Sequence, residues 1–224
     1  MRDIIMGAIE KGQNALSEYD SKRVVESAGV MVSGNRLATS RDEAVQMAED
    51  SGYPVALKGC AATLTHKTEM GMVKLKLKTP DEVAAAYDEI ISKGVELDGV
   101  IVQEWVEGDN REFVIGMTRD PQFGPCVMFG LGGIFTEALQ DVSFRVAPLT
   151  DVDAMEMIDE IKTQKLLGEF RGFPAVDKKM LVDAIVGIGK LSAELEQVAE
   201  IDINPLVIEN SKPVAVDALV ILKK

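Results

Sequence analysis

The sequence is poor in three chemically informative residue types, with two cysteines, one histidine and one tryptophan among 224 residues. Cys60 and Cys126 lack metal-ligand spacing, so we expect two reduced thiols, as in a cytoplasmic protein. No apolar run approaches the roughly 20 residues that span a bilayer. Acids lie near the start of the chain, in Asp3 and Glu10. We therefore expect neither a membrane helix nor a secretory signal.

Positive charge is also scarce. Lysine and arginine together number 24 against 37 acidic residues, which gives a net charge of −13. Binding to a nucleic-acid backbone needs a broad basic surface, so this balance argues against a nucleic-acid partner. The chain is long enough to bury a sizeable core, either in one large domain or in two small lobes.

The common glycine-rich nucleotide motifs are missing. No stretch matches a Walker A loop, and the run that starts at Gly130 has Phe135 where the dinucleotide fingerprint needs its last glycine. Gly130, Gly132 and Gly133 nevertheless follow an apolar run, and their backbone N–H groups could form a nest that binds an anion. A tight turn is the alternative interpretation.

A cationic stretch stands out against this acidic background. From Lys58 to Lys78 there are five lysines and one acid, a local charge of about +4. A bound polyanion such as a nucleoside triphosphate would explain it. Lys58 ends a short apolar run, so it could project from a sheet edge toward a phosphate as a point charge. The alternative is a surface lysine that happens to follow a strand.

His66, the one histidine, lies between Thr65 and Lys67 in a polar loop. Its neighbours are not apolar, so a core position is not expected, and it has no partners for a metal site. It is either an exposed residue without a role, or a phosphate contact or nucleophile.

Helical and strand patterns alternate along the chain. Helices are predicted over 3–29 (two helices), 41–50, 80–94, 151–168 and 177–197, and strands over 30–32, 54–57, 73–77, 99–106, 111–117, 126–129 and 143–147, with a final hairpin of 200–208 and 214–222. Antiparallel hairpins interleaved with helices favour an α+β fold over a doubly wound parallel sheet. Ser40 with Glu43, and Thr79 with Glu82, are spaced as capping boxes.

Several acidic and amide side chains fall inside the predicted strands. Glu104 and Glu112 lie in two adjacent strand candidates, where they are either functional or on a solvated sheet face. In the last hairpin, period two puts Glu200, Asp202 and Asn204 on one face.

The turn of that hairpin sets its register. A two-residue turn at 210–211 would place Asn204 opposite Asp217. Such an oxygen pair suits Mg²⁺, which takes one or two protein ligands in addition to nucleotide phosphates. A polar face without metal is the alternative.

Together these segments resemble the ATP-grasp domain and, more narrowly, the β subunits of ADP-forming acyl-CoA (acetate–CoA) ligases, relatives of succinyl-CoA synthetase. The resemblance rests on EYDSKRVVESAGV at 18–30, YPVALKG at 53–59, THKTEMGMVKL at 65–75, the run 102–133, FRVAPL at 144–149, EIDINPLVI at 200–208 and AVDAL at 215–219. It implies one ATP-grasp domain over 1–224, with two α/β lobes, about 20–100 and 101–224, whose antiparallel sheets clasp ATP, and an N-terminal helix at 3–17.

The resemblance also implies roles for individual residues. ATP would be bound by Lys58 and Lys67 at the phosphates, Glu104 and the backbone through Val106 at the adenine, and Glu112 at the ribose or phosphates. Gly130, Gly132 and Gly133, with Arg145, would lie near the transferred phosphoryl group, while Asn204 and Asp217 would bind Mg²⁺. His66 would be the catalytic residue, transiently phosphorylated.

The implied reaction is acyl-CoA + ADP + phosphate ⇌ acid + CoA + ATP. The sequence has no CoA-binding domain, so the resemblance implies a CoA-binding α subunit as partner, in an α₂β₂ assembly. One departure from the family is Ala61-Ala62-Thr63, where relatives often have Ser-Pro-Asp before the histidine. A regulatory ATP-binding module without turnover and the ATP-grasp part of a protein acyltransferase system are the alternatives.

Overall fold

The computed structural model describes residues 1–64, 67–133 and 139–223, so the predicted catalytic residue His66 lies outside the described residues. The chain forms two compact units. We call Ser17–Asp20 with Ser33–Trp105 the small unit, and Met1–Leu16, Ser21–Val32 and Val106–Lys224 the large unit. Residues 21–32, which fall within the predicted N-terminal lobe, thus belong to the large unit.

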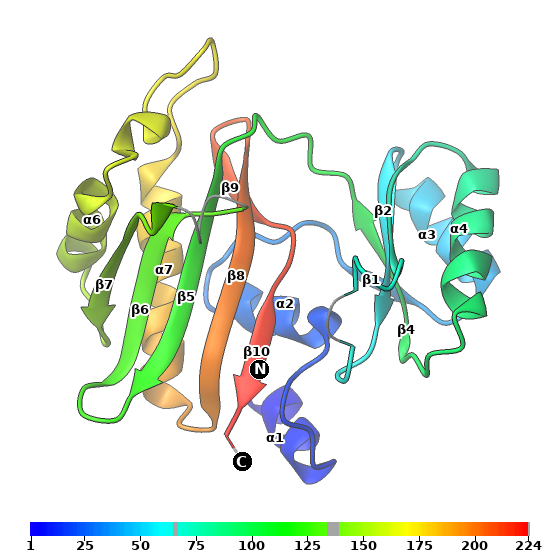
Figure 1. The fold of residues 1–224 in the computed structure, drawn as a ribbon, viewed down its shortest axis with the longest axis horizontal. Coiled ribbons are helices and arrows are strands. Elements are labelled where there is room, and N and C mark those ends of the chain that lie inside the picture. Colours follow the sequence, from blue (N-terminus) through cyan, green and yellow to red (C-terminus); the bar gives the residue numbers. More distant parts are fainter. Residues whose placement is uncertain (65–66, 134–138, 224) are drawn as a thin grey trace. The chain divides into compact units, whose positions relative to one another are not determined.

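The small unit is a four-stranded antiparallel sheet with the order β1-β4-β2-β3. Its strands are β1 (Arg36–Ala38), β2 (Val55–Cys60), β3 (Val73–Leu77) and β4 (Gly99–Glu104), and its helices are α3 (Arg41–Ser51) and α4 (Pro80–Ser92). Every residue of β2 is buried. Figure 1 shows α3 and α4 on one face of this sheet, where they close an apolar core.

The two predicted caps of these helices are confirmed. The Ser40 side chain accepts the Glu43 N–H at the start of α3, and Thr79 accepts the Glu82 N–H at the start of α4. The Glu43 carboxylate also reaches back to the Thr39 N–H at 2.8 Å. Local sequence therefore determines where both helices begin.

The large unit contains a six-stranded antiparallel sheet in which β10-β8-β5-β6-β7 are neighbours and β9 pairs with β8. Its strands are β5 (Glu112–Asp120), β6 (Gly124–Leu131), β7 (Val142–Val146), β8 (Val198–Glu209), β9 (Lys212–Ala215) and β10 (Leu219–Leu222). Its helices are α1 (Arg2–Glu10), α6 (Asp151–Glu160), the 3₁₀ helix η1 (Gln164–Leu167) and α7 (Lys178–Glu194), while α2 (Glu18–Ser27) begins in the small unit and continues into the large one.

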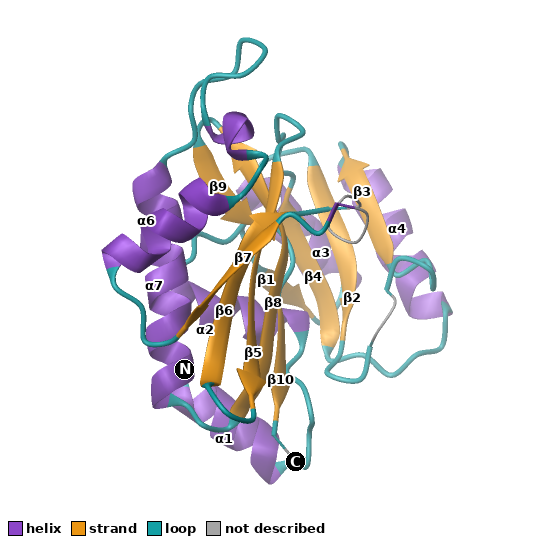
Figure 2. Ribbon diagram, turned by 60° about the vertical axis from the view of Figure 1, so that its left-hand side comes forward, coloured by secondary structure: helices purple, strands orange, loops and turns teal. Residues whose placement is uncertain are grey.

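Helices α6 and α7 cover one face of the six-stranded sheet (Figure 2). Ile203, Ile115, Phe129 and Ser143 are paired across β8, β5, β6 and β7, so these residues share that face. The hydroxyl of Ser143 donates to the Met157 carbonyl of α6, so the side chains of this row face the covering helices. Residues that alternate with this row face the other side of the sheet.

Two predictions of strand layout are wrong, those for 30–32 and for 214–222. Residues 30–32 form no strand and make only an isolated bridge between Val32 and Ala215, while the first strand is β1. The neighbouring runs 99–106 and 111–117 fall in separate sheets, as β4 and β5. The segment 214–222 is divided into β9 and β10. Among the described residues, no helix is long and apolar enough to span a membrane.

Candidate functional site

The C-terminal hairpin has the predicted register. Glu209 pairs with Lys212 across the two-residue turn, and Leu219 pairs with Asp202 further along. These pairs, on either side of the break between β9 and β10, share one register, which sets Asn204 opposite Asp217. The backbone agrees, because the N–H of Val216 donates to the carbonyl of Pro205 at 3.2 Å.

The face that carries Asn204 also carries an acid that the sequence prediction did not assign to the site. Ile201 and Ile203 are buried toward the core, whereas Asp202 and Asn204 are half-buried on the opposite face. Burial, together with the charges of Glu200 and Asp217, raises the pKa of Asp202 to about 6. Three carboxylates near one amide oxygen therefore form an electronegative oxygen-rich group. The period-two pattern of β8 could have predicted that Asp202 belongs to this site.

The glycine turn after β6 contacts this group directly. The N–H of Gly133 donates to Asn204 Oδ1 at 3.1 Å, and the N–H of Gly132 donates to the Glu112 carbonyl at 2.8 Å. Gly133 has φ of 64°, and a Cβ there would lie 2.1 Å from Glu112 Oε2. A Cβ on Gly130 would lie 2.4 Å from the Asp141 carbonyl. Close packing therefore accounts for glycine at these positions, as the tight-turn interpretation requires. The predicted role of these glycines in phosphate binding stays a prediction.

Glu112 and Gly132 also line a pocket of the large unit of about 470 Å³. Its other lining residues are Asn110, Leu131, Leu139, Thr163 and Leu166. The adjacent Arg111 is buried and donates to the carbonyls of Leu166, Gly168 and Pro174 at 3.0, 3.1 and 2.8 Å. Arg111 thereby fixes the irregular segment that forms one wall of the pocket.

In the small unit, one carboxylate holds two of the predicted phosphate-binding lysines. Lys58 Nζ lies 2.7 Å from Glu18 Oε1, and Lys67 Nζ bonds to Glu18 Oε2. The Lys58 and Glu18 side chains are only 8% and 3% exposed. The alternative that Lys58 is an ordinary surface lysine is therefore wrong, because a buried ammonium needs a partner or a ligand.

Glu104 ends β4 and is exposed. A Cβ on Gly34 would lie 3.0 Å from its carboxyl carbon, so the chain passes closely over this side chain. The next residue, Trp105, donates its N–H to the Pro54 carbonyl, and Lys76 Nζ lies 4.9 Å from the centroid of its ring. Lys76 of β3 thus lies over an aromatic ring in a cation–π contact.

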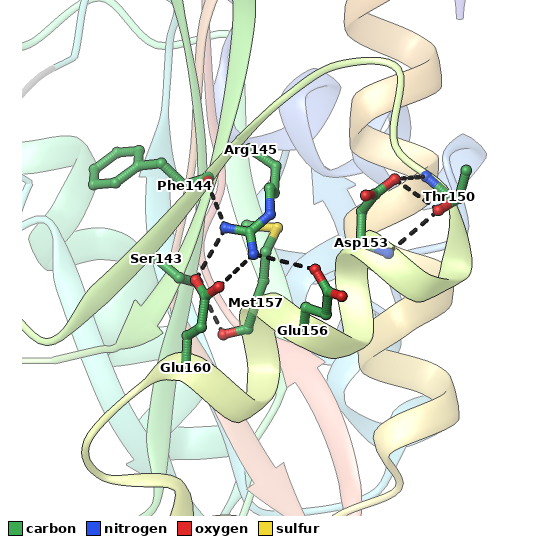
Figure 3. A network of polar contacts seen from close by, with 8 residues as sticks. All are labelled: Ser143, Phe144, Arg145, Thr150, Asp153, Glu156, Met157 and Glu160. Atoms are coloured by element: carbon green, nitrogen blue, oxygen red, sulfur yellow. Dashed lines mark hydrogen bonds and ion pairs between the residues drawn. The ribbon is translucent and has the colours of Figure 1, made fainter.

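Arg145 is not brought to the Asn204 group. It lies on β7 two residues after Ser143, and therefore on the helix-covered face of the sheet. Its guanidinium pairs with Glu160 and Glu156 of α6, at 2.9 and 3.5 Å for the contacts drawn in Figure 3. Asn204 faces the other side. The expectation that Arg145 lies beside the glycine loop near the phosphoryl group is not supported, because adjacent strand positions alternate between faces.

Within the described ranges, no group of three or more His, Cys, Asp or Glu side chains is arranged as a metal cage.

Comparison with known proteins identifies the family. The ATP-grasp domain family matches residues 7–222. The chain belongs to the ATP-grasp family. The predicted α+β, ATP-grasp fold is therefore confirmed.

Named ATP-grasp relatives extend over nearly the whole chain. The chain is 42% identical to the β subunit of acetate–CoA ligase [ADP-forming] I from Pyrococcus furiosus, over 99% of this chain and 97% of that protein. It is 37% identical to acetate–CoA ligase [ADP-forming] I from Archaeoglobus fulgidus, over 98% of this chain but 33% of that protein. The ATP-grasp chain thus matches a separate subunit in one organism and one third of a longer protein in another.

A solved structure is also similar over nearly the whole chain. The acetyl-coenzyme A synthetase 1 of Ca. Korarchaeum cryptofilum, in complex with coenzyme A and Ca-AMPCP, matches with a TM-score of 0.94 and 43% identity, covering 99% of both chains. A second structure of that protein, with a TM-score of 0.88 and 42% identity over 99% of both chains, contains Mg-AMPPCP and a phosphohistidine segment that points towards the nucleotide binding site.

Proposed function

We propose that this chain is the ATP- and ADP-binding phosphotransfer subunit of an ADP-forming acyl-CoA ligase, with acetate as the expected acid. The reaction is acyl-CoA + ADP + phosphate ⇌ acid + CoA + ATP. The observation that carries the proposal is the 42% identity to a β subunit of such a ligase over 99% of this chain.

The cation would be held by Asn204 and Asp217. Their donor atoms are oxygens only, which fits a hard cation. Asn204 Oδ1 already accepts from Gly133, but an amide oxygen has two lone pairs, so one hydrogen bond leaves capacity for a ligand. A bound Mg²⁺ would neutralise phosphate charge during phosphoryl transfer.

The nucleotide contacts follow from the remaining residues. Lys58 and Lys67 would contact the phosphates, Glu104 and the backbone of Val106 the adenine, and Glu112 the ribose or phosphates. The buried Lys58 supports this assignment, because its ammonium is fixed by Glu18 at 2.7 Å. We leave Arg145 out of the site, since it lies on the helix-covered face of its sheet.

His66 would supply the nucleophile. A neutral imidazole nitrogen attacks the γ-phosphorus of ATP, the bond to the leaving ADP oxygen breaks, and a phosphohistidine results. The phosphoryl group then passes to an acid bound by a partner with a CoA-binding domain, and CoA displaces phosphate from the resulting acyl phosphate to give acyl-CoA. The reaction as written above runs through these steps in reverse. An α₂β₂ assembly and a cytoplasmic location are part of this proposal. The free thiols Cys60 and Cys126 support the location.

The test is phosphorylation of the chain by ATP labelled at the γ-phosphate, with and without a CoA-binding partner. We expect an acid-labile, alkali-stable label that the His66→Gln variant does not acquire, and ADP-forming ligase activity only when the partner is present. Nucleotide binding without any label on His66 under either condition would contradict phosphotransfer and favour a nucleotide sensor.

A further inference from the structure

The ion-pair group of Glu18, Lys58 and Lys67 joins three separate segments of the small unit. Glu18 lies in the first turn of α2, Lys58 lies within β2, and Lys67 directly follows His66 in the sequence. One carboxylate oxygen takes the ammonium of Lys58, and the other takes that of Lys67. The three side chains are 3%, 8% and 18% exposed, so these contacts are largely removed from solvent screening.

The first turn of α2 is itself fixed against β2. The Ser17 hydroxyl accepts the N–H of Asp20 at 3.2 Å, and Asn35 donates to the Tyr19 carbonyl at 3.0 Å. Burial raises the pKa of the Cys60 thiol at the end of β2, and that thiol is hydrogen-bonded to the Tyr19 backbone and the Ser17 side chain. Glu18 therefore extends from a rigid support.

We propose that Glu18 is a positioning residue that holds the ammonium groups of Lys58 and Lys67 side by side to receive the phosphates of a nucleotide. This inference rests on the proposed nucleotide-binding function. An ammonium has three N–H donors, so one ammonium can contact Glu18 and a phosphate oxygen at the same time. Two ammoniums and one carboxylate carry a net charge of +1, which attracts an anion. Protein kinases similarly pair a strand lysine that contacts phosphates with a helix glutamate.

A competing role for Glu18 would be to occupy the lysines until a phosphate displaces it. Burial argues against this role. Displacement would take both ammoniums away from a carboxylate that is only 3% exposed, and separating a buried ion pair costs free energy. A phosphate that joins the group, with Glu18 still in place, avoids that cost.

The experiment compares Glu18→Gln with a matched control, Glu89→Gln, in the full-length chain. Glu89 also bonds two lysines of the small unit, Lys74 and Lys93, but its side chain is 51% exposed. Calorimetry measures the dissociation constants for ADP with Mg²⁺ and for adenosine, which has no phosphate. The dissociation constant for adenosine divided by that for ADP measures the phosphate-dependent part of binding. A contact that only stabilises the folded protein would leave this ratio unchanged.

We expect Glu18→Gln to weaken ADP binding about ten-fold, as for the loss of one charge-assisted contact, with adenosine binding unchanged. Glu89→Gln should leave both constants unchanged. An unchanged ratio in a folded Glu18→Gln protein would overturn the inference, and tighter ADP binding would identify Glu18 as a competitor and overturn it too.

A second variant covers the case in which Glu18→Gln does not fold. Glu18→Asp keeps the charge but is one methylene shorter, so it cannot bridge both ammoniums as glutamate does. It should lower the phosphate-dependent ratio in the same direction by about three-fold, and an unchanged ratio would again reject positioning. If the wild-type chain does not bind ADP at all, the proposed function fails, which is distinct from these outcomes.

Discussion

Gly133 and Asn204 are joined by a hydrogen bond of 3.1 Å from the glycine N–H to the amide oxygen. The bond connects the turn after β6 to the polar face of β8, which are 71 residues apart in the sequence. Because the same amide oxygen is a proposed Mg²⁺ ligand, the turn orients that ligand before any cation binds.

Gly133→Ala should weaken ADP binding more than it lowers the unfolding free energy. At φ of 64° an alanine costs about 1 kcal/mol, and its Cβ would push aside the flexible carboxylate of Glu112. Gly124→Ala is the matched control, since Gly124 has φ of 79° with nothing within 4 Å of the added Cβ. We expect similar losses of unfolding free energy in denaturant titrations, but ADP binding about ten-fold weaker only in Gly133→Ala. Equal ADP affinity in the two variants would show that the position of the Glu112 carboxylate does not affect ADP binding.

The cation site can be tested through its metal dependence. Asp217→Asn keeps an oxygen donor but loses the charge that holds Mg²⁺, so Mg²⁺ should enhance ADP affinity about ten-fold less than in the wild type. With EDTA present, ADP binding should be equal or slightly tighter, because one negative charge has gone. Glu200→Gln, which removes a charge from the same face without removing a proposed ligand, should leave the enhancement of ADP affinity by Mg²⁺ at its wild-type value. A loss of ADP affinity that persists in EDTA would argue against a metal-ligand role.

Arg145→Gln tests the separation of the two sheet faces. The ion pairs with Glu156 and Glu160 are partly exposed to solvent, so their loss should cost at most about 1 kcal/mol of unfolding free energy. ADP affinity should stay at its wild-type value, because Arg145 faces α6, whereas Lys58→Gln in parallel should weaken ADP binding. Calorimetry and thermal denaturation measure both quantities. Weaker ADP binding by folded Arg145→Gln would restore the sequence-based assignment.

Asp141 should control the acid stability of the large unit. Burial raises the pKa of its carboxyl, but hydrogen bonds from Thr163 and Lys162 outweigh burial, and the pKa lies below its ordinary value. A lowered pKa adds stability above the unfolded value of about 3.9, and that stability is lost as pH falls through the folded pKa.

Asp141→Asn should therefore reduce the unfolding free energy at pH 7 by about 1–3 kcal/mol, with a smaller deficit below pH 4. Thr163→Val, which removes one donor to Asp141, should show the same trend with a smaller amplitude. Urea titrations across pH measure this, and a deficit that is constant with pH would contradict the assignment.

Local features of the fold were predictable from sequence. Ser40 and Thr79 cap the helices that their spacing predicts, because capping depends on neighbouring residues alone. The turn at Asn210-Ser211 sets the register that brings Asn204 opposite Asp217, because period and turn length fix a hairpin. Strand partners are less local. Consecutive strands β4 and β5 belong to different sheets, which no spacing rule reveals.

The sequence alone determined that this chain is an acidic α+β protein with a cationic stretch, and its motifs identified the ATP-grasp family. Only the tertiary structure decided that Glu18 holds Lys58 and Lys67 together, and that Arg145 faces α6. The physical reason is that backbone periodicity is encoded locally, whereas the partner of a buried charge depends on segments that meet only when the chain folds.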